Sequence, residues 1–315
     1  MSEAAPLRKA GINAPILVFG YVPLWQMREA VRLDLTVTLY TVESAHALSR
    51  AALALGQTVK VHVKIDTGMG RLGIRSEQID EILALMRDIT ASPGIELEGL
   101  YTHFAMADTQ DQTHVRVQLA RFQHVLQVVE GHQLRPPLVH AANSAATISL
   151  PEAHFDMVRP GIALYGMDPS TEVRLPAGFR PALSFKTQVA QVKVIPAGEC
   201  ISYGCTYVTE RPTRVAVLPV GYADGFLRSA SAARGKPAAE VIVAGKRCPL
   251  AGRVSMDLLA VDVSDLAEGA ARRGDLATLI GDGVSVDDLA AGMGTIGYEV
   301  LTNLGRRYHR VYKGE

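Results

Sequence analysis

The sequence predicts an α/β protein with two domains, in which an incomplete (β/α) barrel is followed by a mostly antiparallel β domain. Over the first half of the chain, short apolar runs alternate with longer segments whose apolar residues recur three and four positions apart. From about residue 180, the apolar runs are separated by Gly, Pro and Asp turns instead. At 315 residues, the chain is long enough for two domains.

Six strands are predicted in the first half. They cover residues 14–20, 35–41, 59–66, 97–103, 138–143 and 155–161. Amphipathic helices are expected between them, including residues 43–56 and residues 76–89, the second with Ser76 as its N-cap. The last two strands carry polar groups of the kind that follow strands seven and eight of a closed barrel. The count therefore predicts a barrel that lacks its first two βα units, which would precede residue 1.

The second domain is predicted from β-rich runs such as FKTQVAQVKVIPAG, TRVAVLPVGYADG, EVIVAGKR and LLAVDVS. Residues 168–181 are rich in proline and turn formers and are predicted to be the linker. The predicted domains are therefore residues 1–176 and residues 177–315.

Composition disfavours several classes of partner. Lys plus Arg and Asp plus Glu both number 32, so no net charge attracts nucleic acid or an anionic membrane. The N-terminus MSEAAPLRKAG has no apolar signal core, and no apolar run approaches the length of a membrane span, so a cytoplasmic location is expected. Cys200, Cys205 and Cys248 lack metal-ligand spacing and are predicted to be small buried hydrophobes in a reducing compartment. No metal site is predicted.

Polar residues follow the predicted strands at their carboxyl ends, where barrel sites lie. Within VKVHVKID, Lys60, His62 and Lys64 alternate with apolar residues and so share one face of the strand. The residues at the strand ends are Arg71, His103, Asn143, Ser144, Arg159, Gly161 and Ile162. Each has an ordinary structural explanation alone, such as an N-cap for Ser144 or a core histidine for His103. Together at one rim they indicate an anion pocket flanked by an arginine.

Eight motifs, in order along nearly the whole chain, resemble those of the alanine racemases, which are pyridoxal-phosphate enzymes of fold type III. The motifs are KIDTGMGRLG, GLYTHFA, HAANSAAT, MVRPGIALYG, ISYGCTY, VGYADG, GRVSMD and GYEVLTNLGRRYHRVY. The resemblance implies an isomerase that interconverts L-alanine and D-alanine for the cell wall. It also implies a homodimer in which the β domain of one chain completes the active site of the other.

The resemblance assigns roles to the cofactor-binding residues. Ser144, Gly161, Ile162 and Tyr298 would hold the phosphate of pyridoxal 5′-phosphate, and Arg159 would contact its pyridine nitrogen. A guanidinium only donates hydrogen bonds, so it would keep that nitrogen unprotonated.

Further roles concern proton transfer and the substrate. Tyr207 would be the base on one face of the α-carbon, oriented by His103 of the other subunit. Arg71 would contact the phenolate oxygen of the cofactor, and Lys64, carbamylated, would hold Arg71. The backbone N–H of Met256 would meet the substrate carboxylate. Tyr222 and Asp257 would line the entrance.

The sequence departs from the family in one respect, which concerns the Schiff-base lysine. Family members carry it in a motif like VVKANAYGHG, and none of the eight lysines of this chain has that context. A front-truncated alanine racemase whose activity as given is doubtful is therefore expected. The alternative is an inactive remnant that binds pyridoxal phosphate or a partner chain. A fold-type III decarboxylase fits the C-terminal motifs poorly, and serine is an alternative substrate.

Overall fold

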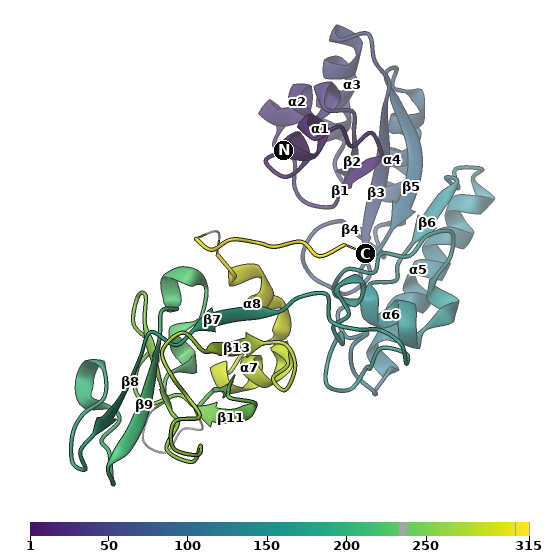
Figure 1. The fold of residues 1–315 in the computed structure, drawn as a ribbon. Helices are drawn as coiled ribbons and strands as arrows, with labels where there is room; N and C mark the ends of the chain where they lie inside the picture. Colours follow the sequence, from purple (N-terminus) through teal and green to yellow (C-terminus); the bar gives the residue numbers. More distant parts are fainter. Residues whose placement is uncertain (233–237, 306, 315) are drawn as a thin grey trace. The chain divides into compact units, whose positions relative to one another are not determined.

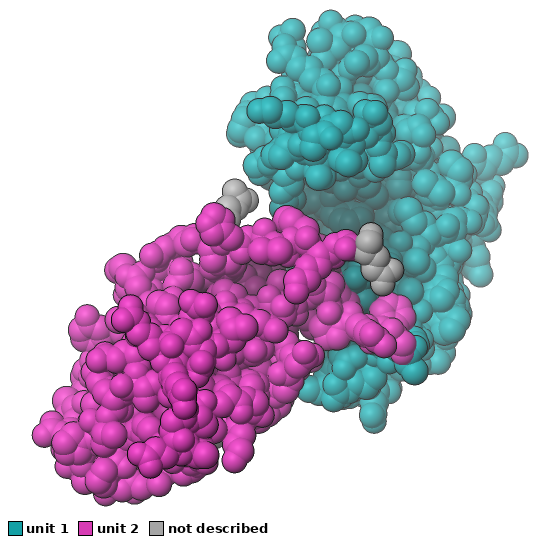
Figure 2. Space-filling view, in the orientation of Figure 1, with its two compact units in different colours: residues 1–164, 168–177 teal, residues 165–167, 178–315 magenta. Residues whose placement is uncertain are grey.

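The computed structural model describes residues 1–232, 238–305 and 307–314. These residues form two compact units, coloured separately in Figure 2. Unit 1 comprises Met1–Leu164 and Asp168–Ala177, and unit 2 comprises Tyr165–Met167 and Gly178–Glu315. Each unit is described by itself.

Unit 1 is built on a parallel sheet with the strand order β1-β2-β3-β5-β6. A short strand, β4, pairs with β3 in parallel. The strands are β1 (Ile16–Val18), β2 (Leu35–Leu39), β3 (Val59–Asp66), β4 (Ile74–Arg75), β5 (Ile95–Tyr101) and β6 (Leu138–His140). Five of the six predicted strands are confirmed as members of one open, partial (β/α) barrel.

The sixth predicted strand, residues 155–161, is not a strand. It contributes only an isolated parallel bridge between Met157 and His140, next to β6. Pro160 has no N–H for a ladder, and the backbone N–H of Arg159 bonds to the carbonyl of Ala142 outside any strand. The segment therefore follows β6 in space without regular pairing.

Helices α2 to α5 pack against their neighbours along the outer face of this sheet (Figure 1). This arrangement follows from right-handed βα crossovers, which return each helix to the same face. The helices of unit 1 are α1 (Ala4–Lys9), α2 (Met27–Arg32), α3 (Val42–Ala54), α4 (Ile79–Ala91), α5 (Thr113–Gly131) and α6 (Ser144–Ser149). Its short 3₁₀ turns are η1 (Leu24–Gln26), η2 (Pro151–Ala153) and η3 (Ile162–Tyr165).

The alternation in β3 separates two environments. Val61, Val63 and Ile65 belong to the hydrophobic core that the helices cover. His62 and Lys64, on the other face, are also buried. A strand with both faces buried is typical of a parallel sheet, but here one face carries polar groups.

The predicted cap of the second helix was wrong. The helix begins at Ile79 after the N-cap Gln78, two residues later than it would with Ser76 as its N-cap. Ser76 is buried, and its N–H bonds to the carbonyl of Asp66 because the chain around it runs beside the end of β3. The pairing of β4 with β3 therefore took precedence over the capping preference of serine.

Unit 2 is antiparallel throughout its described strands, as predicted. Its two sheets have the orders β11-β10-β13-β7 and β12-β9-β8. The strands are β7 (Phe185–Gln188), β8 (Gln191–Ile195), β9 (Thr213–Leu218), β10 (Glu240–Val243), β11 (Lys246–Pro249), β12 (Leu259–Asp262) and β13 (Leu276–Ile280). The other elements are α7 (Val286–Met293), α8 (Gly297–Asn303), η4 (Tyr203–Cys205), η5 (Tyr222–Asp224) and η6 (Arg228–Ala230).

The cysteines behave differently from the prediction. Cys248 is buried with a free thiol, as expected. Cys200 and Cys205 are exposed and form a disulfide, with their Cα atoms 4.9 Å apart. The turn that brings them together contains Gly204 at a φ of 72°, a conformation that favours glycine. Within the described ranges, no helix is both long and apolar enough to cross a bilayer.

Candidate active site

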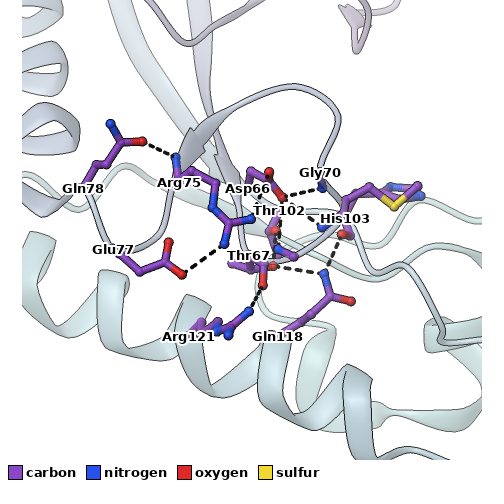
Figure 3. Close-up of polar contacts among 12 residues, drawn as sticks. Asp66, Thr67, Gly70, Arg75, Glu77, Gln78, Thr102, His103, Gln118 and Arg121 are labelled. Atoms are coloured by element: carbon purple, nitrogen blue, oxygen red, sulfur yellow. Dashed lines mark hydrogen bonds and ion pairs between the residues drawn. The ribbon is translucent and has the colours of Figure 1, made fainter.

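The turn after β3 is organised by the carboxylate of Asp66. Its Oδ1 accepts hydrogen bonds from the N–H groups of Gly68, Met69 and Gly70 at 3.0, 2.9 and 3.0 Å (Figure 3). Burial alone would raise the pKa of Asp66, but these N–H groups and the nearby Arg75 together hold it below its ordinary value. The turn is therefore fixed at the point where the chain reaches Arg71.

A glycine is required where this turn returns to the sheet. Gly73 has a φ of 116°, and a Cβ there would lie 2.9 Å from the carbonyl oxygen of Lys64 and from the amide nitrogen of Asp66. Any larger residue would push β4 away from β3. The sequence GMGRLG therefore places Arg71 beside the end of β3 through backbone requirements alone.

Behind the turn, buried polar side chains connect three segments. Gln118 on α5 donates to the hydroxyl of Thr67 and to the carbonyl of His103, each at 3.3 Å (Figure 3). Thr67 and Thr102 share a hydrogen bond of 2.8 Å. The ends of β3 and β5 are thus tied together, which fixes Arg71 and His103 on one rim.

Lys64 is a buried lysine that faces other cations. Its side chain points away from the helices, and its Nζ lies 5.4 Å from the centre of the Tyr101 ring. Burial lowers the pKa of Lys64, and the charges of Arg71 and Arg159 lower it further. Because β3 is an inner strand of the sheet and Lys64 is buried, Lys64 is not a solvated lysine on a sheet edge.

One cavity of about 440 Å³ collects most of the predicted residues of unit 1. It is lined by Phe19, Gly20, Lys64, Arg71, Leu72, Tyr101, His103 and Arg159. Two guanidinium groups and two aromatic rings therefore face one space. This lining suits a flat ring that carries negative charge.

Arg159 is held by its neighbours on several sides. Its Nη1 donates to Nδ1 of His140 at 2.6 Å. Its Nη2 donates to the carbonyls of Thr102 and Ala141 at 2.9 and 3.0 Å, and to Nδ1 of His103 at 3.3 Å. Burial lowers the pKa of Arg159 to about 10, which still leaves it charged at neutral pH.

The two histidines beside Arg159 are uncharged at neutral pH. Burial, followed by the charge of Arg159, lowers the pKa of His103 to about 4 and that of His140 to about 2. Sequence reasoning assigned no role to His140 or Tyr101. His140 lies in the motif HAANSAAT, and Tyr101 lies in the motif GLYTHFA. Their positions in these family motifs could have marked both as candidate site residues.

Some of the residues predicted to bind the phosphate lie together in unit 1. Ser144 Oγ accepts hydrogen bonds from the N–H of Gly161 at 2.8 Å and from that of Ala163 at 3.4 Å. The N-cap of α6 is Asn143, not Ser144, because Asn143 accepts from the N–H of Ala146 at 3.0 Å. Ser144 is therefore free of the capping role that was its ordinary alternative.

The remaining predicted residues are divided between the two units. Ile162 begins η3 in unit 1, next to Gly161, whereas Tyr298 lies on α8. Tyr222, Met256 and Asp257 are exposed and lie on two loops that approach closely. A Cβ on Gly221 would lie 2.3 Å from the carbonyl oxygens of Ser255 and Met256, so only glycine permits this approach.

Asp257 also has a partner near the end of the chain. Its Oδ1 lies 2.7 Å from Nη2 of Arg307, and Arg307 also approaches Asp224 at 3.7 Å. The predicted entrance residue is therefore held by an exposed ion pair.

The side chain of Tyr207 is engaged by its neighbours in unit 2. It is half-buried against Ile201, Val215 and Ala251. Burial raises the pKa of Tyr207, and the charge and hydrogen bond of Asp262 raise it further. A phenol in this position gives up its proton less readily than an ordinary tyrosine.

Tyr203, in the same motif, is the opposite case. Its side chain is 71% exposed, and it begins η4 immediately before the turn that the disulfide closes. The motif ISYGCTY contains both tyrosines, and the pattern alone does not tell which hydroxyl faces outward. Tyr203 is therefore a candidate that sequence reasoning missed.

Comparison with known proteins identifies the family. A model described as "Alanine racemase, N-terminal domain" matches residues 1–169, and one described as "Alanine racemase, C-terminal domain" matches residues 182–312. A protein of Desulfosudis oleivorans named alanine racemase is 46% identical over 99% of this chain and 81% of its own length. One of Symbiobacterium thermophilum is 41% identical over 100% of this chain and 82% of its own length.

Solved structures agree with these matches. The alanine racemase of a D-cycloserine-producing Streptomyces lavendulae has a TM-score of 0.92 at 39% identity, covering 100% of this chain and 82% of that one. The Bacillus anthracis enzyme, solved with bound L-Ala-P, has a TM-score of 0.86 at 38% identity, covering 97% and 77%. These matches give no support to the predicted absence of a front segment. The two family models together account for both units, and the chain belongs to the alanine racemase family.

Proposed function

We propose that this chain interconverts L-alanine and D-alanine with pyridoxal 5′-phosphate as its cofactor. The observation that carries the proposal is the cavity of about 440 Å³ in which Lys64, Arg71, His103 and Arg159 meet. When bound, pyridoxal phosphate draws electrons from the α-carbon of an attached amino acid, which makes the proton on that carbon removable. The rest of the site would position this chemistry and handle the proton.

Arg159 would hold the pyridine nitrogen. Its guanidinium lines the cavity and is fixed by His140 and by two backbone carbonyls. Because a guanidinium has no acceptor and stays charged, it donates to the ring nitrogen and keeps a proton off it. Ser144, Gly161, Ile162 and Tyr298 would bind the phosphate, with the Ser144 hydroxyl beside the N–H of Gly161.

Lys64 would act as a carbamate. Its lowered pKa favours the neutral amine, which can add to carbon dioxide and release a proton to solvent. The product is an anion placed between two guanidinium groups, which replaces repulsion by attraction. It would orient Arg71 toward the oxygen substituent of the cofactor ring.

A tyrosine from the β domain would move the α-proton on one face. The prediction from the motif is Tyr207, but the hydroxyl of Tyr207 is engaged by Asp262. The exposed Tyr203 presents a phenol to another chain without breaking that hydrogen bond. We therefore propose a homodimer in which Tyr203 or Tyr207 of one chain meets His103 of the other. His103, uncharged at neutral pH, can orient a phenol by a hydrogen bond.

Proton transfer on the second face of the α-carbon requires a lysine as the other base. Among the described residues, Lys64 is the lysine that lines the cavity. Of the others, Lys9 and Lys60 lie elsewhere in unit 1, and Lys236 is outside the described residues. If Lys64 is a carbamate, the chain as given would bind the cofactor without turning over alanine. This is the second candidate function, an inactive cofactor-binding protein, and the presence of Lys64 in the cavity lining is the observation that favours testing it.

The test compares the chain with a fusion to the leading segment of the 46%-identical relative. Each protein is incubated with pyridoxal phosphate, reduced with borohydride, digested and analysed by mass spectrometry, while D-alanine is assayed in parallel. We expect cofactor binding by both proteins, and D-alanine formation together with a modified lysine in the fusion. A fusion that binds cofactor but forms no D-alanine from L-alanine would overturn the proposed activity. A single stoichiometrically modified Lys64 with turnover in the chain itself would overturn the second candidate function.

A further inference from the structure

A line of hydrogen bonds leads from the cavity to the far end of β3 and β5. Arg159 Nη1 lies 2.6 Å from Nδ1 of His140, and Nε2 of His140 lies 2.7 Å from Nδ1 of His62. Nε2 of His62 lies 3.1 Å from Oε2 of Glu98. The other oxygen of Glu98 accepts from Lys60 Nζ at 2.7 Å. All five residues belong to unit 1.

The donor and acceptor in each hydrogen bond of the line follow from Arg159, the residue at its start. Arg159 can only donate, so Nδ1 of His140 must carry a lone pair. Neutral His140 then has its proton on Nε2 and donates to Nδ1 of His62. Neutral His62 in turn has its proton on Nε2 and donates to Glu98. Every N–H in the line points toward the carboxylate.

The alternative protonation states are disfavoured. If both nitrogens of His140 were protonated, its Nδ1–H would point at the guanidinium of Arg159. Burial, followed by the charge of Arg159, also lowers the pKa of His140 to about 2. Burial also lowers the pKa of His62, although Glu98 opposes this. Glu98 stays ionised, because the hydrogen bonds from Lys60 and His62 outweigh its burial and hold its pKa below the ordinary value.

The surroundings leave little freedom for either ring. Tyr101 stacks on His140 with ring centres 4.7 Å apart and planes 7° from parallel. A Cβ on Gly99 would lie 2.3 Å from Nδ1 of His62, so the residue after Glu98 must be glycine for His62 to fit. His62 and His140 are both buried.

Arg159 needs such a line because no carboxylate among the described residues contacts it directly. Its hydrogen-bond acceptors are two histidine nitrogens and two carbonyl oxygens, and its guanidinium carbon lies 5.5 and 5.3 Å from the ring centres of Phe19 and Tyr101. None of these contacts brings a full negative charge to it. Glu98 is the carboxylate that reaches it through hydrogen bonds. Hydrogen-bonded chains polarise their members, so a charge at one end strengthens the acceptor at the other.

We propose that Glu98, acting through His62 and His140, is a positioning residue that fixes where Arg159 aims its remaining N–H groups in the cavity. The role of Arg159 toward the pyridine nitrogen rests on the proposed function, whereas the order of the line does not. Removing the carboxylate frees His62 to move its proton to Nδ1. That proton would face the Nε2–H of His140, and relief by a tautomer change in His140 would turn an N–H toward Arg159.

The experiment uses the full chain labelled with ¹⁵N-histidine. Two disrupting variants, Glu98→Leu and His62→Phe, remove the acceptor at different points of the line. Glu98→Gln keeps an acceptor without the charge. Glu96→Leu changes an exposed carboxylate on the same strand and serves as the matched control. Circular dichroism melts select the variants that fold, and either disrupting variant suffices.

Two readouts are taken from each protein. Two-bond ¹H–¹⁵N spectra report the tautomers, and we expect both His62 and His140 as neutral Nε2–H forms in the unchanged chain. In a disrupting variant we expect altered His140 nitrogen signals and an affinity for pyridoxal phosphate lower by about tenfold, the cost of misaligning one charge-assisted hydrogen bond. Glu98→Gln should recover most of the affinity, and Glu96→Leu should lose none.

Unchanged His140 signals with an affinity within twofold of the original chain, in a folded disrupting variant, would overturn the proposal. An Nδ1–H tautomer of His140 in the unchanged chain would also overturn it. If the unchanged chain binds no pyridoxal phosphate, the proposed function fails instead, and the histidine spectra still decide whether Glu98 orders the line.

Discussion

At the scale of residues, the two tyrosines of ISYGCTY differ in what surrounds their hydroxyl groups. Tyr207 packs against an apolar cluster and bonds to Asp262, whereas Tyr203 is 71% exposed. Proton transfer between chains requires a hydroxyl that another chain can reach. The structure therefore favours Tyr203 over the residue that the motif first suggested.

The two tyrosines can be separated by phenylalanine substitutions in the fusion protein described above. We expect Tyr203→Phe to lower racemisation by roughly 10²–10⁴-fold, the contribution of a positioned proton-transfer group. Tyr207→Phe should lower thermal stability more than it lowers turnover. The assay measures D-alanine formed from L-alanine and the reverse. The opposite ranking would restore Tyr207 as the base.

Lys64 predicts a pH dependence of stability. Its folded pKa lies below the unfolded value near 10.5, so the unfolded chain binds more protons between the two values and stability rises with pH there. At neutral pH in CO₂-free buffer, Lys64→Met should therefore stabilise the protein by about 1 kcal/mol, because it removes a poorly paired buried amine. The gain should shrink as the pH approaches the unfolded pKa.

The matched control for Lys64 is Lys60, four residues earlier on β3. Its pKa is raised by the hydrogen bond and charge of Glu98, so Lys60→Met should bring no gain at neutral pH. Urea melts at several pH values measure both variants. Adding ¹³C-bicarbonate should produce one carbamate signal that Lys64→Met lacks. A stabilising Lys60→Met would contradict the assignment.

At the scale of elements, the glycine turn between β3 and β4 carries Arg71 into the cavity. Gly68, Gly70 and Gly73 all have positive φ there, and Gly70 and Gly73 differ in their surroundings. A Cβ at Gly73 would meet backbone atoms of β3 at 2.9 Å, whereas one at Gly70 would meet nothing within 4 Å. The turn therefore depends on Gly73 for space and on Gly70 only for conformation.

This difference predicts two unequal effects. Gly73→Ala should destabilise the protein by about 2 to 4 kcal/mol, because it adds a backbone clash to an unfavourable φ. Gly70→Ala should cost only about 1 kcal/mol, the strain of a left-handed conformation. Denaturant unfolding measures both. Equal effects would show that the contact between β4 and β3 does not limit the turn.

At the scale of the whole molecule, unit 1 has an open strand edge with exposed aromatic residues beside it. Strand β1 lies at the end of the described sheet, and the nearby Phe19, Tyr21 and Trp25 are exposed, Trp25 at 79%. Unpaired strand edges and exposed aromatic groups promote association. Family resemblance and these surfaces point to the same expectation, a chain that does not stay monomeric.

The isolated chain should therefore associate or aggregate at micromolar concentration. Size-exclusion chromatography with light scattering measures its mass, and a thermal melt measures its cooperativity. Trp25→Gln should reduce the association if exposed aromatic groups drive it. A monodisperse monomer with a cooperative melt would contradict this expectation.

The sequence by itself determined the elements whose signal is local. Periods of two and of three to four residues gave five strands of unit 1 and the antiparallel character of unit 2, because side-chain alternation follows directly from backbone geometry. The motifs also identified Lys64, Arg71, His103 and Arg159, which the structure brings to one cavity. These are features that neighbouring residues or a contiguous motif can encode.

The tertiary structure decided everything that depends on residues far apart in the chain. Ser76 is not the N-cap of α4, because β4 pairs with β3 just before it. Residues 155–161 follow β6 without forming a strand. The line from Glu98 through His62 and His140 exists because the register of β3, β5 and β6 sets three strands side by side. Exposure likewise separates Tyr203 from Tyr207. Burial and register are sums over distant contacts, so no local pattern contains them.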